Sequence, residues 1–300
     1  MTHEAINLCR EALPDALAFR DAAGRTAAGL AAPGGPVEPV LLDTHQFALH
    51  GYAWMATYVN ALEQLLGWAE RLESDGRFSD LESMILTCGF GAYLKQLKYG
   101  IAMSQDEIAR PGDLGLDESD FFGGAAARKL MKEGDSIAVR QAIAETLRDR
   151  SGEFGDRGLD ETHVMIADQF RRFSDEKVSP HAHGWHVRDE LIPLEIIHEM
   201  AELGVFGLTI PEEDGGLGLG KIAMCVVTEE LSRGYIGVGS LGTRSEIAAE
   251  LIRVNGTPAQ KEKYLGPIGA GEILPTAVFT EPNHGSDLAH IRTRATRDGD

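Results

Sequence analysis

Apolar residues recur every three or four positions along much of this 300-residue chain, which is the spacing of an amphipathic α-helix. The longest run predicts a helix that starts near Asp43 or Thr44 and ends at Gly76. Its apolar positions are Trp54, Tyr58, Leu62, Leu65, Leu66, Ala69 and Leu72. A stripe of this kind favours the core of a helix bundle over a cofactor-binding surface.

A capping box is predicted just after this helix. Ser79 and Glu82 have the spacing in which each side chain accepts a hydrogen bond from the other's backbone N–H, and they open a second helix that ends at Gly100. Residues 21–40 are rich in Ala, Gly and Pro and are interpreted as a loose lead-in to these helices.

Shorter helical patterns cover residues 117–132 and 135–150, so residues 1–150 are expected to form a helical N-terminal extension. The polar, glycine-containing stretch that follows predicts a linker over residues 151–159. Helical periodicity resumes at Asp160 and continues, with interruptions, through residues 160–272, which are expected to form a second helical domain.

Within this second domain, helices are expected over residues 194–203 and 221–233. Thr257 and Pro258 have the pattern of an N-cap and first helical residue, and they predict a short helix to Leu265.

After Gly271 the pattern changes from helix to strand. Residues 273–279 predict a buried strand, residues 290–296 a second strand, and Asp298-Gly299 a hairpin turn. Because two strands alone are not stable, residues 273–300 are expected to begin a β-domain of a longer polypeptide, although a natural C-terminus with a frayed edge stays open. The expected fold class is therefore mostly α, with only the start of a β-domain.

Charge and cysteine content narrow the functional classes. There are 28 Lys and Arg residues against 47 Asp and Glu residues, a formal net charge of −19, which disfavours nucleic acids and anionic membranes as partners. The three cysteines lack a CxxC pair and suit a reducing cytoplasm. No apolar stretch approaches the ~20 residues that span a bilayer, so membrane insertion is not expected.

The segment Thr280-Glu281-Pro282-Asn283-His284-Gly285-Ser286-Asp287 is the first candidate for chemistry. It places hydroxyl groups and a Gly-Ser pair in a turn after the predicted strand, an arrangement that can present N–H and O–H groups to phosphates. An ordinary turn is the alternative.

Arg244 is the second candidate. Thr243 and Glu246 have capping-box spacing, which would put Arg244 in the first turn of a helix, where a cation opposes the helix dipole. An Arg beside helix-start N–H groups suits a carboxylate or phosphate ligand. The alternatives are an Arg that points into solvent or pairs with Glu246.

Two further clusters have less support as functional sites. The spacing of His181, His183 and His186 permits metal ligation, but surface histidines are favoured and no metal site is expected. Of Glu229 and Glu230, inside an apolar helix, one is expected to face inward or towards Arg233, which lies three or four residues further along the helix.

From about residue 160 onward the chain resembles the acyl-CoA dehydrogenase family. The motifs that carry the resemblance are Leu203–Leu208, Ile210–Gly218, Glu229–Ser232, Gln260–Leu265 and Thr280–Asp287. The run Tyr52–Val59 in the extension and the run Ser232–Glu246 are similar to the methylsuccinyl-CoA dehydrogenase subfamily.

The resemblance implies FAD as cofactor. It implies that the flavin is lined by Ala277, Val278, Phe279, Thr280, Gly285 and Ser286. Thr280 would bond the flavin ring, and Ser286 would meet the pyrophosphate or the CoA moiety. Arg244, Ser245 and Ser286 would bind substrate, with Arg244 facing a distal carboxylate. The general-base Glu of the family is expected beyond Asp300, so no catalytic residue is assigned within the chain.

The activity implied is α,β-dehydrogenation of a short branched dicarboxylyl-CoA thioester, most closely methylsuccinyl-CoA to mesaconyl-CoA in the ethylmalonyl-CoA pathway. Electron-transfer flavoprotein would accept the electrons, and the protein would be a homodimer or homotetramer. The alternatives are another short-chain or dicarboxylic acyl-CoA, or a non-catalytic helical oligomerisation module. His284, His290 and Phe279 depart from the usual family residues.

Overall fold

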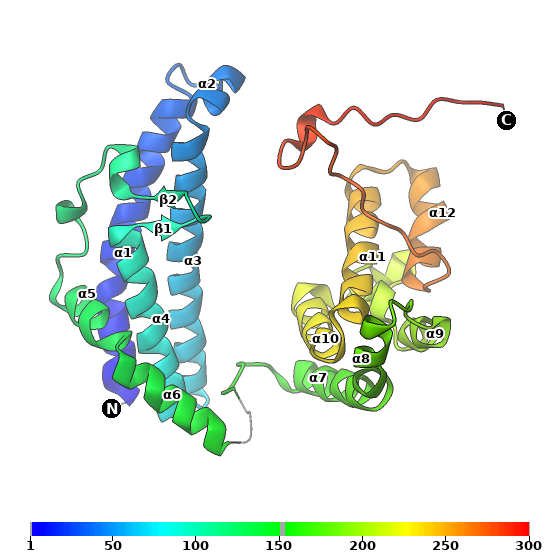
Figure 1. Cartoon of the computed structure of the whole chain (residues 1–300), viewed down its shortest axis with the longest axis horizontal. Helices are drawn as coiled ribbons and strands as arrows, with labels where there is room; N and C mark the ends of the chain where they lie inside the picture. The colour runs from blue at the N-terminus through cyan, green and yellow to red at the C-terminus, as the bar shows by residue number, and fades with distance from the viewer. Residues whose placement is uncertain (1, 151–153, 300) are drawn as a thin grey trace. The chain divides into compact units, whose positions relative to one another are not determined.

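The computed structural model describes residues 2–150 and 154–299 and is mostly helical, which confirms the predicted fold class (Figure 1). The chain divides into two compact units, residues 1–158 and 159–300. Each unit has a hydrophobic core of its own.

Three long helices build the first unit: α1 (Thr2–Ala31), α3 (Gln46–Ser74) and α4 (Asp80–Tyr99). They contact one another pairwise and lie side by side in Figure 1. The predicted stripe on α3 faces this core, with four positions buried and three partly buried. Tyr58 stacks on Tyr93 of α4, with ring centroids 4.6 Å apart. The interpretation of the aromatic stripe as bundle core is therefore confirmed.

The expected loose lead-in over residues 21–40 is largely wrong, because α1 continues to Ala31. Alanine is the strongest helix former, and its small side chain lets α1 lie close to its neighbours. Ala16, Ala23 and Ala27 are buried in the core. At Gly24 an added Cβ would lie 3.0 Å from the Tyr52 hydroxyl oxygen, so this glycine lets α1 and α3 pack closely.

A six-residue helix, α2 (Pro39–Thr44), lies between α1 and α3. The start predicted for the long helix near Asp43 or Thr44 therefore falls at the end of α2, and α3 begins at Gln46. The predicted end is confirmed: Asp75 caps α3 and Gly76 has a φ of +69°, a left-handed conformation that favours glycine.

The capping box at Ser79 and Glu82 is confirmed. The buried Glu82 carboxylate also accepts a hydrogen bond from the backbone N–H of Asp156 at 2.9 Å, and Trp68 donates its indole N–H to the Asp156 carbonyl. These bonds tie residues 154–158 to α3 and α4. Burial alone would raise the pKa of Glu82, but hydrogen bonds from Ser79, Asp156 and its own backbone lower it overall.

The rest of the first unit consists of short elements. They are the hairpin β1 (Ile101–Ala102) and β2 (Ile108–Ala109), the 3-10 turns Pro111–Leu114 and Glu118–Asp120, α5 (Ala125–Lys129), the π-helical turn Leu130–Gly134 and α6 (Ile137–Asp149). The strands pair antiparallel, Ile101 with Ala109 and Ala102 with Ile108. The prediction of helix over 117–132 is thus partly wrong, whereas 135–150 is confirmed as α6. Residues 151–153 of the predicted linker lie outside the described residues.

Six helices build the second unit: α7 (Glu161–Phe173), α8 (Ser179–Val187), α9 (Leu194–Glu202), α10 (Gly220–Gly234), α11 (Ile236–Asn255) and α12 (Pro258–Gly269). A π-helical turn, Ser174–Val178, joins α7 to α8, and 3-10 turns span Val205–Gly207 and Glu212–Asp214. The helices expected over 194–203 and 221–233 are α9 and α10. Thr257 and Gln260 form a capping box that opens α12, which runs past Leu265 to Gly269.

The predicted helix start at Thr243 is wrong, because α11 runs unbroken from Ile236 to Asn255. The Thr243 hydroxyl donates to the Ser240 carbonyl instead of capping a helix end. Glycine at 239 lets α11 lie against α10, since an added Cβ there would clash with the backbone and side chain of Ser232. Tertiary packing thus keeps the segment helical where the local pattern suggested a boundary.

The two predicted strands at the C-terminal end do not form in the part of the chain that the structure describes. Residues 273–279 are extended but unpaired, and Val278 is 80% exposed, so this segment is not a buried strand. Within residues 281–293 there are only the isolated bridge between Glu281 and His284 and a 3-10 turn, Leu288–His290. A strand needs a neighbouring strand for its backbone N–H and C=O groups, and an apolar sequence alone does not supply one.

Candidate functional site

Residues 274–280 lie at the surface of the second unit as an extended arm, and a turn follows at residue 281 (Figure 1). Val278, Phe279 and Thr280 are exposed, and Ala277 is half-buried. Exposed apolar side chains next to one another on an unpaired segment are typical of a surface that a ligand or another protein segment covers. Four of the six residues predicted to line a flavin, residues 277–280, are therefore at least partly accessible to a ligand.

Glu281 closes the turn. Its carboxylate accepts hydrogen bonds from the backbone N–H of Arg292 at 2.9 Å, and from the backbone N–H and hydroxyl of Thr293. The Glu281 backbone N–H donates to the His284 carbonyl at 2.9 Å. The bonds from Thr293 and Arg292 hold the pKa of Glu281 below its usual range. Residues 281–293 thus form a closed loop, which we call the signature loop.

Gly285 and Ser286 lie on the exposed side of the signature loop. A Cβ added at Gly285 would meet no heavy atom within 4 Å, and the residue does not have the positive φ that favours glycine. Among the residues that the structure describes, neither packing nor backbone conformation accounts for glycine here. An open backbone beside the exposed hydroxyls of Thr280 and Ser286 suits the close approach of a flat ring or a pyrophosphate.

Two histidines of the signature loop gather around Asp287. The ring Nδ1 of His290 lies 2.8 Å from both carboxylate oxygens of Asp287, and the Nδ1 of His284 lies 3.9 Å from one of them. His284 is half-buried and His290 exposed. Two of the three departures from the family pattern, His284 and His290, therefore form one cluster with Asp287.

Arg244 lies in the middle of α11 and not at a helix start. The free backbone N–H groups that were predicted to bind an anion beside Arg244 are therefore absent at this position. Its Nη1 donates to the Ser240 carbonyl at 2.9 Å and the Ser240 hydroxyl at 2.7 Å. Glu246, the alternative partner, pairs with Lys221 instead. Within residues 2–150 and 154–299 no carboxylate forms an ion pair with Arg244, which leaves an exposed guanidinium on this face of α11.

The same face of α11 continues as an apolar stripe. Ile247, Leu251 and Val254 follow Arg244 at spacings of three and four residues, and all three are exposed. Ser245, the other predicted substrate contact on α11, is only 1% exposed and points to the inner side of the helix. The structure thus joins Arg244 to an apolar surface rather than to Ser245.

The signature loop and Arg244 are not joined to each other. Among the residues that the structure describes, no hydrogen bond or ion pair links residues 277–293 to Arg244 or Ser245. Direct bonds therefore do not connect Arg244 and Ser245 to the predicted flavin-lining residues in the described part of the chain.

A buried carboxylate was foreseen at Glu229 or Glu230, and it is Glu230, which is 2% exposed. The predicted contact with Arg233 is confirmed, with Nε 3.4 Å from Oε2. Arg171 of α7, which the sequence reasoning missed, donates to both carboxylate oxygens at 2.8 and 3.1 Å. Arg171 directly follows the buried Phe170 on α7, and this was the only local hint of its role. The Arg171–Glu230 ion pair joins α7 to α10, so we assign it a role in stabilising the fold.

The segment over residues 203–219 is compact because its backbone folds back on itself. Leu217, Gly218 and Leu219 donate to the carbonyls of Gly207, Ile210 and Leu208 at 2.8 to 2.9 Å. This motif of the second unit is therefore a packed turn that supports the core.

The three histidines of α8 are exposed, and among the described residues no group of three His, Cys, Asp or Glu side chains has the arrangement of a metal site. No helix in the described part of the chain is long and apolar enough to cross a membrane.

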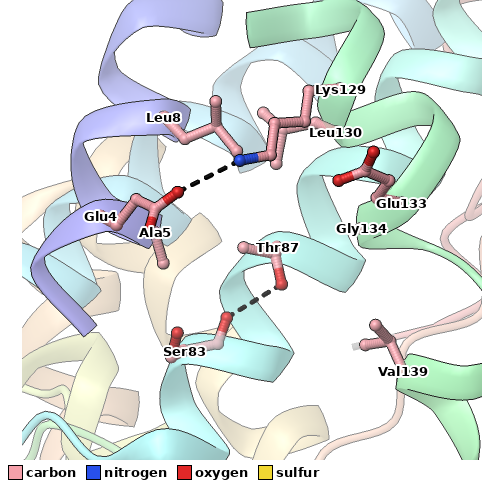
Figure 2. A pocket seen from close by; sticks show the side chains of 10 residues that line it. All are labelled: Glu4, Ala5, Leu8, Ser83, Thr87, Lys129, Leu130, Glu133, Gly134 and Val139. Carbon is pink, nitrogen blue, oxygen red and sulfur yellow. Dashed lines mark hydrogen bonds and ion pairs between the residues drawn. The ribbon is translucent and has the colours of Figure 1, made fainter. Parts of the chain in front are cut away.

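A cavity of about 230 Å³ opens in the first unit between α1, α4, α5 and α6 (Figure 2). Its lining is Glu4, Ala5, Leu8, Ser83, Thr87, Lys129, Leu130, Glu133, Gly134 and Val139. Lys129 donates to Glu4 at 3.1 Å across the opening, and the Thr87 hydroxyl donates to the Ser83 carbonyl at 3.0 Å. Because these polar groups are engaged within the protein, we assign no ligand to this cavity.

Comparison with known proteins gives consistent matches. Residues 160–272 match the family model described as Acyl-CoA dehydrogenase, N-terminal domain. The chain is 54% identical over 299 residues to (2S)-methylsuccinyl-CoA dehydrogenase of Cereibacter sphaeroides, which covers 99% of this chain and 54% of that protein. It is 31% identical over 167 residues to mitochondrial isovaleryl-CoA dehydrogenase of Arabidopsis thaliana, covering 54% of this chain and 41% of that protein.

Among solved structures, the chain is similar to glutaryl-CoA dehydrogenase from Mycobacterium smegmatis, with 33% identity and a TM-score of 0.43 over 47% of this chain and 37% of that one. The chain spans about half the length, or less, of the curated relatives it matches. On these sequence matches the chain belongs to the acyl-CoA dehydrogenase family, and its residues 160–272 match the model of that family's N-terminal domain.

Proposed function

We propose that the protein containing this chain oxidises methylsuccinyl-CoA to mesaconyl-CoA, the step used in the ethylmalonyl-CoA pathway. The observation that carries the proposal is the 54% identity to (2S)-methylsuccinyl-CoA dehydrogenase across both units. The identity extends through residues 1–158, which lie outside the family model, so it covers the helical extension as well as the common domain.

FAD is the cofactor that we propose. The open backbone at Gly285, the exposed hydroxyls of Thr280 and Ser286, and the exposed arm over residues 277–280 fit a flat ring and its pyrophosphate. Thr280 would donate a hydrogen bond to the ring, and Ser286 would donate to the pyrophosphate or to the CoA moiety. Bound there, FAD would supply the acceptor for the hydride that leaves the β-carbon of the thioester.

Arg244 would bind the distal carboxylate of the substrate. The bonds from Nη1 to Ser240 hold one edge of the guanidinium, and the other N–H groups can pair with a carboxylate. Such a pair offsets the cost of removing the carboxylate from water, and the stripe of Ile247, Leu251 and Val254 offers an apolar wall beside it. Ser245 and Ser286 remain our proposed neighbours of the substrate.

The α-proton would be taken by a Glu beyond residue 300, as the family resemblance implies. Residues of this chain would therefore bind and orient the substrate and keep water from it, and none of them would take the proton. We propose electron-transfer flavoprotein as the electron acceptor and a homodimer or homotetramer as the assembly. We propose the cytoplasm as the location, because three free thiols suit a reducing compartment.

A panel of thioesters tests this proposal. The complete gene product is purified with FAD and assayed with an artificial electron acceptor and with methylsuccinyl-CoA, glutaryl-CoA, isovaleryl-CoA and butyryl-CoA. We expect the highest kcat/KM for methylsuccinyl-CoA, by tenfold or more. A higher value for another thioester would favour the alternative substrate, and a colourless protein without activity would favour a non-catalytic helical module.

A further inference from the structure

The Glu281 side chain joins the two ends of the signature loop. The Glu281 carboxylate receives its hydrogen bonds from residues 11 and 12 positions further along the chain. In a β-hairpin, backbone carbonyls would accept those N–H groups, but neither flanking segment is paired as a strand. The carboxylate therefore accepts the N–H groups that backbone carbonyls would accept in a β-hairpin. It joins the arm before the loop to the segment after the loop.

The side-chain chemistry of Glu281 is specific to this task. An ionised carboxylate only accepts hydrogen bonds, and three donors converge on it: the N–H groups of Arg292 and Thr293 and the Thr293 hydroxyl. All three donors reach Oε1, and the Arg292 N–H also reaches Oε2. A glutamine would remove the negative charge that strengthens these bonds and would turn its NH₂ group towards the Arg292 N–H, so it matches the donors less well. The lowered pKa of Glu281 agrees with a carboxylate that stays ionised.

The negative charge of Glu281 is directed into the loop, away from the exposed residues proposed to meet the cofactor. Glu281 is half-buried with its oxygens occupied inside the loop, whereas Thr280, Gly285 and Ser286 are exposed. A free carboxylate beside a pyrophosphate would repel it, but here the carboxylate is engaged by donors within the loop.

We propose that Glu281 is a positioning residue, which closes residues 281–293 into a preformed loop and so presents Thr280 and Ser286 to FAD. This inference rests on the proposed function, because it takes FAD as the ligand. Its energetic basis is preorganisation: a loop already closed before binding loses less conformational freedom when the cofactor arrives.

The test uses the complete gene product and three variants: Glu281→Gln, Glu281→Ala and, as control, Glu272→Gln at an exposed glutamate just before the arm. FAD affinity is measured by flavin fluorescence after the cofactor is removed and added back. We expect the Kd for FAD to rise at least tenfold for both Glu281 variants and to stay within twofold for the control. At saturating FAD, kcat should return to within threefold of the unaltered protein, because a residue that only positions the loop takes no part in the chemical step.

Backbone hydrogen–deuterium exchange gives a second readout that needs no cofactor. In the unaltered protein the amides of Arg292 and Thr293 should be protected, and Glu281→Gln should remove that protection without changing the exchange of α10 and α11. Unprotected amides in the unaltered protein would overturn the loop closure. Equal Kd values for FAD in the unaltered protein and Glu281→Gln would overturn the positioning role. Protected amides with no FAD binding by the unaltered protein would count against the proposed function, leaving the closed loop intact but without the cofactor that we assign to it.

Discussion

Arg244 and Ser240 are joined on α11 by two hydrogen bonds from the same nitrogen: Nη1 donates to the Ser240 carbonyl at 2.9 Å and to its hydroxyl at 2.7 Å. Ser240 lies one helical turn before Arg244, so it fixes one edge of the guanidinium against its own helix. The remaining N–H groups are held in a defined direction at low entropic cost, which is the arrangement that a carboxylate ligand requires.

Replacing Arg244 should therefore change substrate choice. We expect Arg244→Ala to lower kcat/KM for methylsuccinyl-CoA about 100-fold, equivalent to ~2.7 kcal/mol, because the distal carboxylate loses its partner. Activity with butyryl-CoA, which has no such carboxylate, should fall less than threefold. Arg253→Ala, at an arginine paired with Glu250 on the same helix, is the matched control and should change neither. Equal losses for both substrates in Arg244→Ala would remove Arg244 from the substrate site.

Glu230 should matter for stability rather than for activity. We expect Glu230→Gln to lower the free energy of unfolding by ~1–3 kcal/mol, since the buried carboxylate accepts bonds from both Arg171 and Arg233. The low end is favoured because both arginines are about half exposed. Urea denaturation measures the change, and Glu250→Gln, at a surface ion pair, should cost less than ~1 kcal/mol. A loss no larger than that of Glu250→Gln would contradict the structural role.

Glu82 should make the first unit sensitive to acid. Its pKa is lowered in the folded protein, so its stabilisation is complete above the pKa of the unfolded chain, ~4.3, and is lost as the pH falls through the folded value. We expect Glu82→Gln to cost ~1–2 kcal/mol at pH 7 through the weakened cap and the Asp156 bond. This loss of unfolding free energy should become smaller as the pH falls below ~4.3.

Circular dichroism during denaturation at several pH values measures this trend. Glu118→Gln, at an exposed glutamate of the same unit, serves as the control and should show no such dependence. A cost for Glu82→Gln that stays constant down to the acid transition would show that the carboxylate charge does not carry the stabilisation.

Gly239 should tolerate no side chain. A Cβ at this position would overlap Ser232 of α10, so we expect Gly239→Ala to destabilise the second unit by ~1–3 kcal/mol through overpacking. Gly266→Ala in α12 is the control, because its Cβ would have only an ordinary contact, 3.8 Å from the Asp214 carbonyl oxygen, and alanine favours helix. Thermal melting should show a lower Tm for the first variant and an unchanged or higher Tm for the second. Equal melting temperatures would show that α11 can move away from α10 without cost.

Local sequence patterns predicted those parts of the fold that depend on neighbouring residues. The capping box at Ser79 and the N-cap at Thr257 formed where they were expected, because each satisfies backbone groups within three residues. The same pattern at Thr243 failed, since contacts between α10 and α11 keep that segment helical. Local propensity is a weak guide wherever tertiary packing decides.

The site shows the same limit. The motif over residues 280–287 was recognisable from its residues, and the structure leaves it exposed. The role of Glu281 was not foreseen, because its donors lie 11 and 12 residues further on and no periodic pattern relates them. The strand predicted over residues 273–279 did not form, since pairing requires a partner that an apolar run does not specify. The contact of Arg171 with Glu230 likewise depends on how α7 meets α10.

The identity of the reaction product tests the account most directly. The complete gene product is mixed with methylsuccinyl-CoA and an artificial electron acceptor, and the thioesters are separated and weighed by mass spectrometry. We predict that the flavin absorbance bleaches when substrate is added without acceptor, and that mesaconyl-CoA, two hydrogens lighter than the substrate, accumulates with acceptor present. A flavin that stays oxidised, with methylsuccinyl-CoA recovered unchanged while another acyl-CoA is dehydrogenated, would contradict the proposed function.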